Sequence, residues 1–214
     1  MKTEEFSSIL LKHFPFETTS GQQILLSKLS DFILGRNSDQ IFVIKGYAGT
    51  GKTTIVRSLV QSLPAVNGKT SLLAPTGRAA KVLSNYTQKQ AYTIHKKIYF
   101  KKNTNEGGFA FQLQQNLHND TIFIVDEASM ISSSGGLSSA GSLLDDLISY
   151  VFNGNNCKLI LIGDTAQLPP VGLDISPALD TEFLKASYYF PVDFFELTQV
   201  VRQTENSGIL TNAT

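Results

Sequence analysis

The chain lacks the features that mark secreted and membrane proteins. Its 214 residues include a single cysteine, Cys157, so no disulfide can form within the chain, which fits a reducing compartment. No apolar run approaches the length of a membrane span, and the N-terminus has no signal-peptide pattern. We therefore expect a soluble, cytoplasmic protein without a membrane partner.

The chain also lacks net charge, because 18 Lys and Arg residues balance 18 Asp and Glu residues. No overall basic field therefore indicates nucleic acid, although a local basic patch is enough to bind it. One local excess of positive charge does lie beside His95, where four lysines are close together in the sequence: Lys96, Lys97, Lys101 and Lys102.

A glycine-rich segment, residues 46–53, is the strongest signal in the chain. Its sequence Gly-Tyr-Ala-Gly-Thr-Gly-Lys-Thr fits the pattern G-x-x-x-x-G-K-[ST], and it lies between an apolar strand-like run, 41–44, and a segment with helical spacing, 55–63. In such a loop the backbone N–H groups point at phosphate oxygens, and the helix N-terminus adds partial positive charge. This P-loop predicts a nucleoside triphosphate site rather than a turn that only links a strand to a helix.

Two side chains of the P-loop have predicted roles of their own. Lys52 is expected to reach the β- and γ-phosphates, and Thr53 is expected to offer its hydroxyl to Mg²⁺. The residues of this segment predicted to hold the nucleotide are Gly46, Ala48, Gly49, Thr50, Gly51, Lys52, Thr53 and Thr54.

Apolar runs typical of buried strands alternate with segments of helical spacing, which predicts an α/β domain with a mainly parallel sheet. A helix is expected from an N-cap at Thr19 or Ser20 to Gly35, and a short helix is expected to open at Ser176-Pro177. The further predicted strands are 70–74, 121–125, 157–162 and 194–198.

The predicted strand 121–125 ends in two acids, Asp126 and Glu127, which is costly in a buried position unless a cation or substrate meets them. Beside a P-loop, this arrangement predicts that Asp126 holds Mg²⁺ directly or through water. It also predicts that Glu127 orients and deprotonates the attacking water. Gln167 follows a third strand end, where it can touch whatever occupies the P-loop.

Two β-prone runs, 98–102 and 109–113, flank a polar turn with glycines and predict an inserted β-hairpin. Exposed aromatic side chains beside lysines would suit stacking on unpaired bases, whereas packing of the hairpin on its own domain is an equally open alternative. The aromatic residues concerned are Tyr99, Phe100, Phe109 and Phe111. The Ser/Gly-rich stretch 132–142 is expected to be a mobile loop.

Four stretches in this order resemble the first motor domain of the superfamily 1 DNA helicases, in the RecD-like and Dda-like branch. They are the P-loop and residues 74–80, 126–130 and 163–170. The resemblance implies a RecA-like P-loop NTPase domain over residues 18–204, with ATP and Mg²⁺ as cofactors and the hairpin insert at about 98–118. Residues 1–17 would form a lead-in helix and 205–214 a tail.

The resemblance also implies roles for single residues. Gln22 is similar to the family's adenine-reading glutamine, with the adjacent Gln23 as the alternative. Gln167 resembles the γ-phosphate sensor, and Arg202 resembles the first of two arginines that stabilise charge on the transferring phosphoryl group. The implied catalytic residues are therefore Lys52, Glu127, Gln167 and Arg202.

The surface implied to hold single-stranded DNA consists of Pro75, Thr76, Arg78, Thr93 and His95. For two of these residues a structural role is a serious alternative. Thr76 can cap the helix that follows it, and His95 can be a structural histidine.

The expected function is the ATP-binding N-terminal half of an ATP-dependent DNA helicase that moves on single-stranded DNA in repair or recombination, with the exonuclease V alpha-subunit type as one option. The family's motor has a second RecA-like domain, which this chain lacks. We therefore expect a fragment that hydrolyses ATP slowly and does not unwind DNA. Expected partners are single-stranded DNA, the missing domain and other repair subunits. The rival functions are a small-molecule kinase and a nucleotide-gated binding module.

Overall fold

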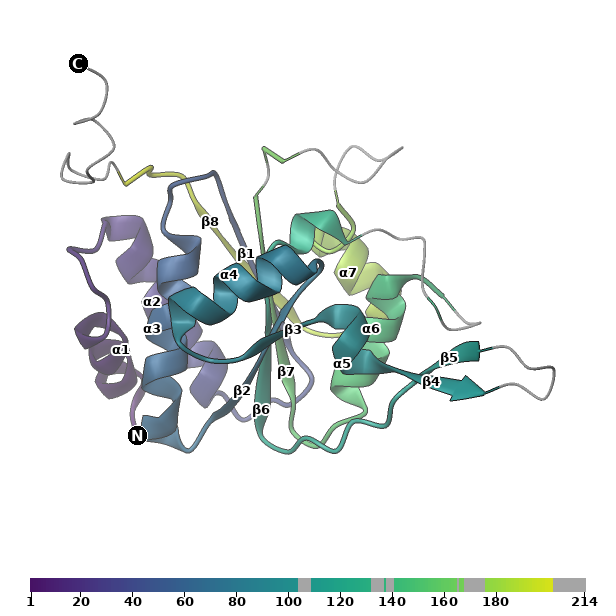
Figure 1. Cartoon of the computed structure of the whole chain (residues 1–214). Coiled ribbons are helices and arrows are strands. Elements are labelled where there is room, and N and C mark those ends of the chain that lie inside the picture. Colours follow the sequence, from purple (N-terminus) through teal and green to yellow (C-terminus); the bar gives the residue numbers. More distant parts are fainter. Residues whose placement is uncertain (104–108, 132–136, 138–140, 165, 168–175, 202–214) are drawn as a thin grey trace, which may run out of the picture.

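The computed structural model describes residues 1–103, 109–131, 137, 141–164, 166–167 and 176–201 (Figure 1). Three sequence-based predictions therefore lie outside the described residues, at least in part. They concern the turn of the hairpin, most of the Ser/Gly-rich stretch 132–142, and Arg202 with the tail 205–214.

A six-stranded sheet forms the centre of the molecule, with strand order β3-β2-β6-β7-β1-β8. Every neighbouring pair in it is parallel, which confirms the predicted α/β class. The strands are β1 (Ile41–Gly46), β2 (Lys69–Ala74), β3 (Ala91–Thr93), β6 (Thr121–Val125), β7 (Lys158–Gly163) and β8 (Val192–Leu197).

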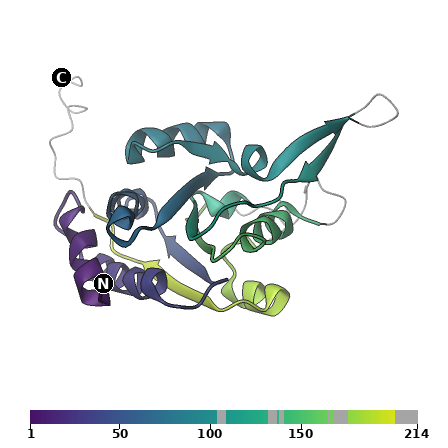
Figure 2. The same ribbon diagram turned by 90° about the horizontal axis from the view of Figure 1, so that it is seen from below.

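Helices cover both faces of this sheet (Figures 1 and 2). The first face packs against α1 (Thr3–Lys12), α2 (Ser20–Leu34), α3 (Lys52–Ser62) and α4 (Gly77–Thr87). The second face packs against α5 (Ile94–Ile98), α6 (Leu143–Phe152) and α7 (Thr181–Tyr188). Two short 3₁₀ turns, Leu63–Val66 and Ala128–Met130, complete the described elements.

The central strands β1, β6 and β7 are apolar at nearly every position because both of their faces are buried. In β1, Phe42 and Ile44 belong to the core beneath α1–α4, whereas Ile41 and Val43 belong to the core beneath α5–α7. Successive side chains of a strand point to opposite faces, so a two-sided core requires a continuous apolar run. No helix within the described ranges combines the length and apolarity that spanning a bilayer requires.

The ends of α2 lie where the sequence predicts them. Thr19 is the N-cap, and its hydroxyl accepts a hydrogen bond from the backbone N–H of Gln22 at 3.2 Å. The helix ends at Leu34, and Gly35 is the C-cap. An oxygen-bearing side chain before the first turn and a glycine after the last are local signals that need no tertiary information.

The short helix predicted at Ser176-Pro177 is wrong, because residues 177–179 form a turn and α7 begins at Thr181. Asp180 caps α7 by accepting hydrogen bonds from the N–H groups of Glu182 and Phe183. The Ser176 hydroxyl donates to backbone carbonyls of the turn after β6.

The predicted hairpin is confirmed as an antiparallel pair, β4 (Tyr99–Asn103) and β5 (Phe109–Leu113), that projects from the molecule (Figure 1). Its base packs on the domain, since Tyr99 is buried and donates to Asp146 of α6 at 2.5 Å. Farther out, Phe100 and Phe111 are 44% and 37% exposed. The base of the hairpin is therefore packed on the domain, and these two aromatic side chains are exposed; stacking on unpaired bases stays a prediction.

Lys158, the first residue of β7, is buried at the C-terminal end of α2. Its ammonium donates to the carbonyl oxygens of Phe32 at 2.5 Å and Gly35 at 2.8 Å, and it lies 5.2 Å from the centre of the Phe32 ring. Burial lowers the pKa of Lys158. A cation suits this position because a helix C-terminus leaves carbonyls unpaired and partly negative. Lys158 therefore fastens α2 to the sheet.

Replacing Lys158 with Met keeps an unbranched apolar stem but leaves these carbonyls without their donor. We expect K158M to lower the free energy of unfolding by about 1–3 kcal/mol, the usual cost of unsatisfied buried polar groups. Urea unfolding measures the change. The control is Lys185→Met in α7, which removes an exposed lysine paired with Glu182 and should change stability by less than about 0.5 kcal/mol. Equal stability of the two variants would contradict the role given to Lys158.

Candidate nucleotide-binding site

The candidate site lies at the carboxyl edge of the sheet, where three neighbouring strands end. The strands β6, β7 and β1 are adjacent and parallel, so the segments that follow them emerge side by side. The P-loop follows β1, Asp126 and Glu127 follow β6, and Asp164 follows β7. This is the edge at which open parallel sheets bind ligands.

Glycines allow the P-loop its tight path at two positions. At Gly46, an added Cβ would lie 2.8 Å from the Thr50 hydroxyl and 3.0 Å from the carbonyl oxygen of Leu197. Gly51 has φ +89°, and a Cβ there would lie 2.6 Å from the side-chain nitrogen of Gln22. Larger residues would push the loop away from the helix that follows it, so the structure explains both fixed glycines.

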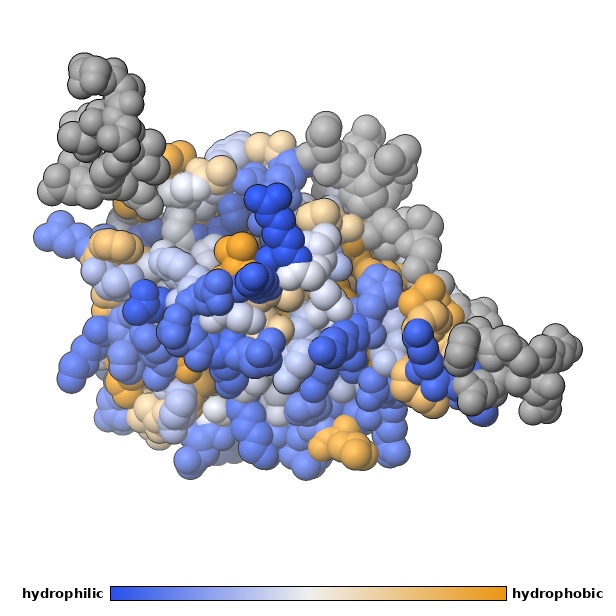
Figure 3. All heavy atoms as spheres, viewed as in Figure 1, coloured by the Kyte–Doolittle hydropathy of each residue, from blue (hydrophilic) through white to orange (hydrophobic). Residues whose placement is uncertain are grey.

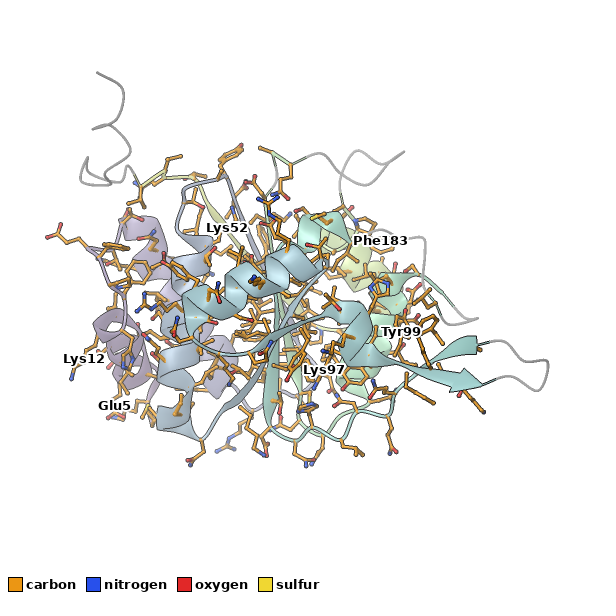
Figure 4. All side chains as sticks on the ribbon, viewed as in Figure 1. Glu5, Lys12, Lys52, Lys97, Tyr99 and Phe183 are labelled. Carbon is orange, nitrogen blue, oxygen red and sulfur yellow. The ribbon has the colours of Figure 1, made fainter. Side chains whose placement is uncertain are left out.

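Lys52 lies where the P-loop joins α3, at the upper edge of the view in Figure 4. Its ammonium donates to the carbonyl oxygens of Gly46 at 2.6 Å and Tyr47 at 2.8 Å. It also lies 3.6 Å from a carboxylate oxygen of Asp164. Lys52 is therefore held over the loop, where a bound phosphate would replace these partners.

Asp164 is a site residue to which the sequence analysis assigns no role. It is 7% exposed, and one of its carboxylate oxygens accepts a hydrogen bond from the N–H of Ala166 at 2.8 Å. The sequence signal that could have identified Asp164 is an acid directly after an apolar strand. The same signal identifies Asp126. Its pairing with Lys52 depends on β7 lying beside β1, which the sequence does not reveal.

Asp126 and Glu127 follow the end of β6, and the backbone of Glu127 has an unusual conformation. Burial raises the pKa of Asp126 to about 6; the charge of Glu127 adds to the rise, whereas a backbone hydrogen bond and the charge of Lys52 oppose it. Glu127 has φ +57°, a left-handed conformation that is uncommon for residues other than glycine. Such strained residues cluster at functional sites.

Glu127 is held by a short chain of hydrogen bonds. The side-chain nitrogen of Gln167 donates to the Glu127 carboxylate at 2.8 Å, and the buried Ser129 hydroxyl donates to the Gln167 carbonyl oxygen at 2.6 Å. The structure thus joins the loop after β7 to the carboxylate after β6. The sequence predicts Gln167 near the site, but no pattern in it points to Ser129, which precedes Gln167 by 38 residues.

Of the two candidate adenine readers, Gln22 is buried and Gln23 is exposed. The Gln22 amide accepts from the N–H of Thr19 at 3.0 Å and donates to the carbonyl oxygen of Thr50 at 2.9 Å. In this arrangement Gln22 supports the P-loop from α2. Gln23 instead donates to the hydroxyl of Thr18 on the surface. Adenine reading by either glutamine stays a prediction.

The remaining P-loop residues differ in what surrounds them. Ala48 is exposed, and the carbonyl oxygen of Gly49 accepts from the N–H of Val201 at 3.0 Å. The chain therefore passes the P-loop one residue before Arg202, which lies outside the described residues. The hydroxyl of Thr54 is 3.0 Å from the hydroxyl of Tyr86 in α4.

The donor atoms at this edge fit Mg²⁺, which prefers oxygen ligands and is usually held by one or two protein side chains together with phosphates. Asp126 and the half-buried Thr53 supply a carboxylate and a hydroxyl. The described part of the chain contains no group of three or more His, Cys, Asp or Glu side chains that could hold a metal alone. Metal binding by Asp126 and Thr53 stays a prediction.

The residues predicted to bind DNA lie together on the same edge of the sheet. Ala74 of β2 pairs with Thr93 of β3, so the segments after these strands are neighbours. The hydroxyls of Thr76 and Thr93 cap α4 and α5, which confirms the capping alternative for Thr76. The predicted residues in these segments are Pro75, Thr76, Arg78, Thr93 and His95.

The predicted DNA-binding residues differ in their exposure to solvent. Arg78 is exposed, whereas His95 is half-buried with its ring 5.7 Å from that of Tyr99. The order β3-β2-β6-β7-β1 places β6 and β7 between these residues and the P-loop. The polar residues at the ends of β2 and β3 and the candidate nucleotide site thus share one edge. Contact of these residues with DNA stays a prediction.

The parallel sheet, the P-loop between β1 and α3, and a carboxylate pair at the end of a nearby strand together define a P-loop NTPase domain. The match to known sequences specifies the family. The AAA domain family matches residues 33–213, and the chain belongs to that family.

The chain is also homologous to two proteins that are named as helicases. It is 32% identical over 176 residues to the ATP-dependent DNA helicase dda of Enterobacteria phage T4, covering 80% of this chain and 36% of that protein. It is 29% identical over 171 residues to the ATP-dependent RecD2 DNA helicase of Deinococcus radiodurans, covering 80% of this chain and 21% of that protein. The resemblance to the RecD-like and Dda-like branch is confirmed, and the chain spans about a third or less of these relatives.

Among solved structures, the Pif1 helicase from Candida albicans superposes with a TM-score of 0.55 at 20% sequence identity. The match covers 88% of this chain and 41% of that chain. At this level of identity the likeness concerns the fold. It confirms the predicted RecA-like arrangement of sheet and helices.

The raised pKa of Asp126 predicts a pH dependence of metal binding. The carboxyl is ionised above about pH 7 and gains a proton as the pH falls through about 6, and a protonated carboxyl is a poor Mg²⁺ ligand. We expect Mg²⁺-dependent ATP affinity to be constant above about pH 7 and to fall by up to about tenfold per pH unit below about pH 6. ATP titrations with and without Mg²⁺ between about pH 5 and 8 measure this.

The matched control is Asp126→Asn, which cannot titrate. It should lack the Mg²⁺-dependent step near pH 6 while keeping any change that comes from protonation of the nucleotide itself. An identical pH profile for the wild type and D126N would remove Asp126 from the set of metal ligands.

Proposed function

We propose that this chain is the ATP-binding half of the motor of an ATP-dependent DNA helicase. The observation that carries the proposal is the contact between Gln167 and Glu127. It joins a carboxylate able to activate water to a loop at the same sheet edge as the proposed DNA-binding residues. Homology to two ATP-dependent DNA helicases supports it.

In this function each site residue has a task. The P-loop N–H groups and Lys52 hold the phosphates of ATP, and Thr53 and Asp126 hold Mg²⁺, which supplies positive charge to the transferring phosphoryl group. Glu127 accepts a proton from the attacking water. Gln167 contacts Glu127, so a change at the γ-phosphate position can move the loop after β7.

Adenine recognition by Gln22 or Gln23 and charge stabilisation by Arg202 complete the proposal.

We infer that residues 18–204 form one RecA-like domain, with an inserted hairpin at about 98–118, and that a second motor domain and other repair subunits act with it. The second domain would supply an arginine finger, and lack of one costs about 10³–10⁵ in rate in other phosphoryl-transfer enzymes. Pro75, Thr76, Arg78, Thr93 and His95 would contact the single-stranded DNA backbone. The lone buried Cys157 supports a reducing compartment such as the cytoplasm.

The rival functions explain less of the site. A small-molecule kinase needs a pocket for its phosphate acceptor and gives no role to the loop after β7. A nucleotide-gated module that only switches partners has no use for a carboxylate held beside the phosphate site, and Glu127 is held by Gln167.

ATP turnover by this chain, measured with and without a single-stranded oligonucleotide, tests the proposal. We expect slow turnover here and strong DNA stimulation in a longer protein that also contains the second domain, because the arginine finger comes from that domain. In that longer protein, replacing Glu127 with Gln should reduce turnover by about 10²–10⁴ while ATP still binds. Brisk, DNA-independent turnover by this chain, or normal turnover by E127Q, would overturn the proposal.

Ser129 is expected to act through Gln167 rather than on the nucleotide. Ser129→Ala removes the donor to the Gln167 carbonyl, so Gln167 can turn away from Glu127. The loss of one such hydrogen bond should lower turnover by about tenfold without changing ATP affinity. The matched control is Ser30→Ala, a buried serine of α2 whose hydroxyl bonds only within its own helix. Equal turnover in the two variants would show that Ser129 has no positioning role.

A further inference from the structure

Positive charge is unevenly distributed along this chain although its net charge is zero. Residues 40–119 contain 11 Lys and Arg residues and one acid, Glu106, whereas residues 120–214 contain 3 Lys and Arg residues and 12 acids. The first range includes β1 and α3, and also β2, β3, α4, α5 and the hairpin, which lie together at the β3 end of the sheet (Figure 1). Eight of the 11 basic residues lie in or beside the elements at the β3 end: Lys69, Arg78, Lys81, Lys89, Lys96, Lys97, Lys101 and Lys102. One flank of the molecule is therefore strongly basic.

We call this surface the basic flank, and its central residues are Lys69, Lys89, Tyr92, Lys96, Lys97 and His118. Lys69 begins β2, and the ammonium of Lys89, just after α4, donates to the hydroxyl of the adjacent Thr70. Lys69 pairs with Thr121 at the start of β6, three residues after His118. Burial lowers the pKa of His118, and the charges of Lys97 and Lys69 lower it further. Three segments far apart in the sequence thus bring their positive charges together.

Two lysines of the basic flank share one aromatic ring. The ammonium groups of Lys96 and Lys97 lie 5.8 Å and 5.9 Å from the centre of the Tyr92 ring, so they are at most about 12 Å apart. Within the described ranges, no carboxylate lies within ion-pair distance of either lysine. Hydrophilic side chains cover much of this face in Figure 3, and Figure 4 labels Lys97 on it.

The chemistry of the basic flank fits a regular polyanion rather than an unpaired nucleic-acid strand. Lysine ammonium groups attract phosphate as point charges. Tyr92 already has two ammonium groups over its ring and is therefore poorly placed to stack on a base, the contact on which single-strand binding depends. Duplex DNA carries one charge per about 1.7 Å of its axis and needs no stacking partner.

We propose that the basic flank docks the phosphate backbone of double-stranded DNA. Lys96 and Lys97 lie in α5, directly after Thr93 and His95 and directly before the projecting hairpin. A duplex on the flank therefore lies beside the hairpin, while a single strand occupies the carboxyl edge of the sheet. The proposal rests on the proposed helicase function, because it divides the two DNA forms between two surfaces of one motor domain.

Fluorescence anisotropy of this chain with a blunt duplex and with a single-stranded oligonucleotide, over a range of salt concentrations, tests the proposal. The variant carries Lys69→Gln, Lys96→Gln and Lys97→Gln. We expect duplex affinity to fall by roughly tenfold or more near 0.1 M salt, and the slope of log affinity against log salt to fall by about 2–3. Single-strand affinity and DNA-independent ATP turnover should stay as in the wild type, which also shows that the variant is folded.

The matched control neutralises three exposed lysines in or beside α1 and α2, outside the basic flank, namely Lys2, Lys12 and Lys28, by the same change to Gln. It should leave duplex binding unchanged. Unchanged duplex affinity in the flank variant, an equal loss in the control, or an equal loss of single-strand affinity would each overturn the proposal. Loss of duplex binding in the flank variant supports the docking proposal even if DNA does not stimulate ATP turnover. This test is therefore separate from the test of the helicase function.

Discussion

The parallel alignment of the strands is the constraint on which the candidate site depends. Because all six strands run the same way, the polar groups that follow them emerge at one edge, and the order β6-β7-β1 makes three of these groups neighbours. Lys52, Asp126 and Asp164 come from distant parts of the chain and meet only there. An antiparallel β7 would carry Asp164 to the opposite edge and leave Lys52 without its carboxylate.

The same edge concentrates charge in a partly buried place. The raised pKa of Asp126 reflects the cost of ionising a buried carboxyl beside Glu127, and the charge of Lys52 only partly offsets it. Perturbed titratable groups of this kind are a feature of functional sites. A nucleotide with Mg²⁺ would supply both the positive charge that the carboxylates lack and the negative charge that suits Lys52 and the P-loop.

Helix α2 links this edge to the rest of the sheet because it is anchored at both ends. Near its start, Gln22 bonds to the carbonyl oxygen of Thr50 and so supports the P-loop. At its end, the buried ammonium of Lys158 bonds to its last carbonyls. The helix thus connects the amino end of β7 to the glycine loop after β1. Loss of either contact would allow α2 to shift relative to the P-loop.

The sequence by itself determined the fold class, the P-loop, the limits of α2 and the hairpin, because these depend on local patterns of glycine, caps and apolar spacing. Local patterns failed at Ser176, because the helix begins at Thr181 with Asp180 as its N-cap, whereas the Ser176 hydroxyl bonds to the turn after β6. Only the tertiary structure decided that Asp164 pairs with Lys52 and that Ser129 reaches Gln167. The physical reason is that such contacts depend on which strands are neighbours, and strand order is set by packing of the whole chain.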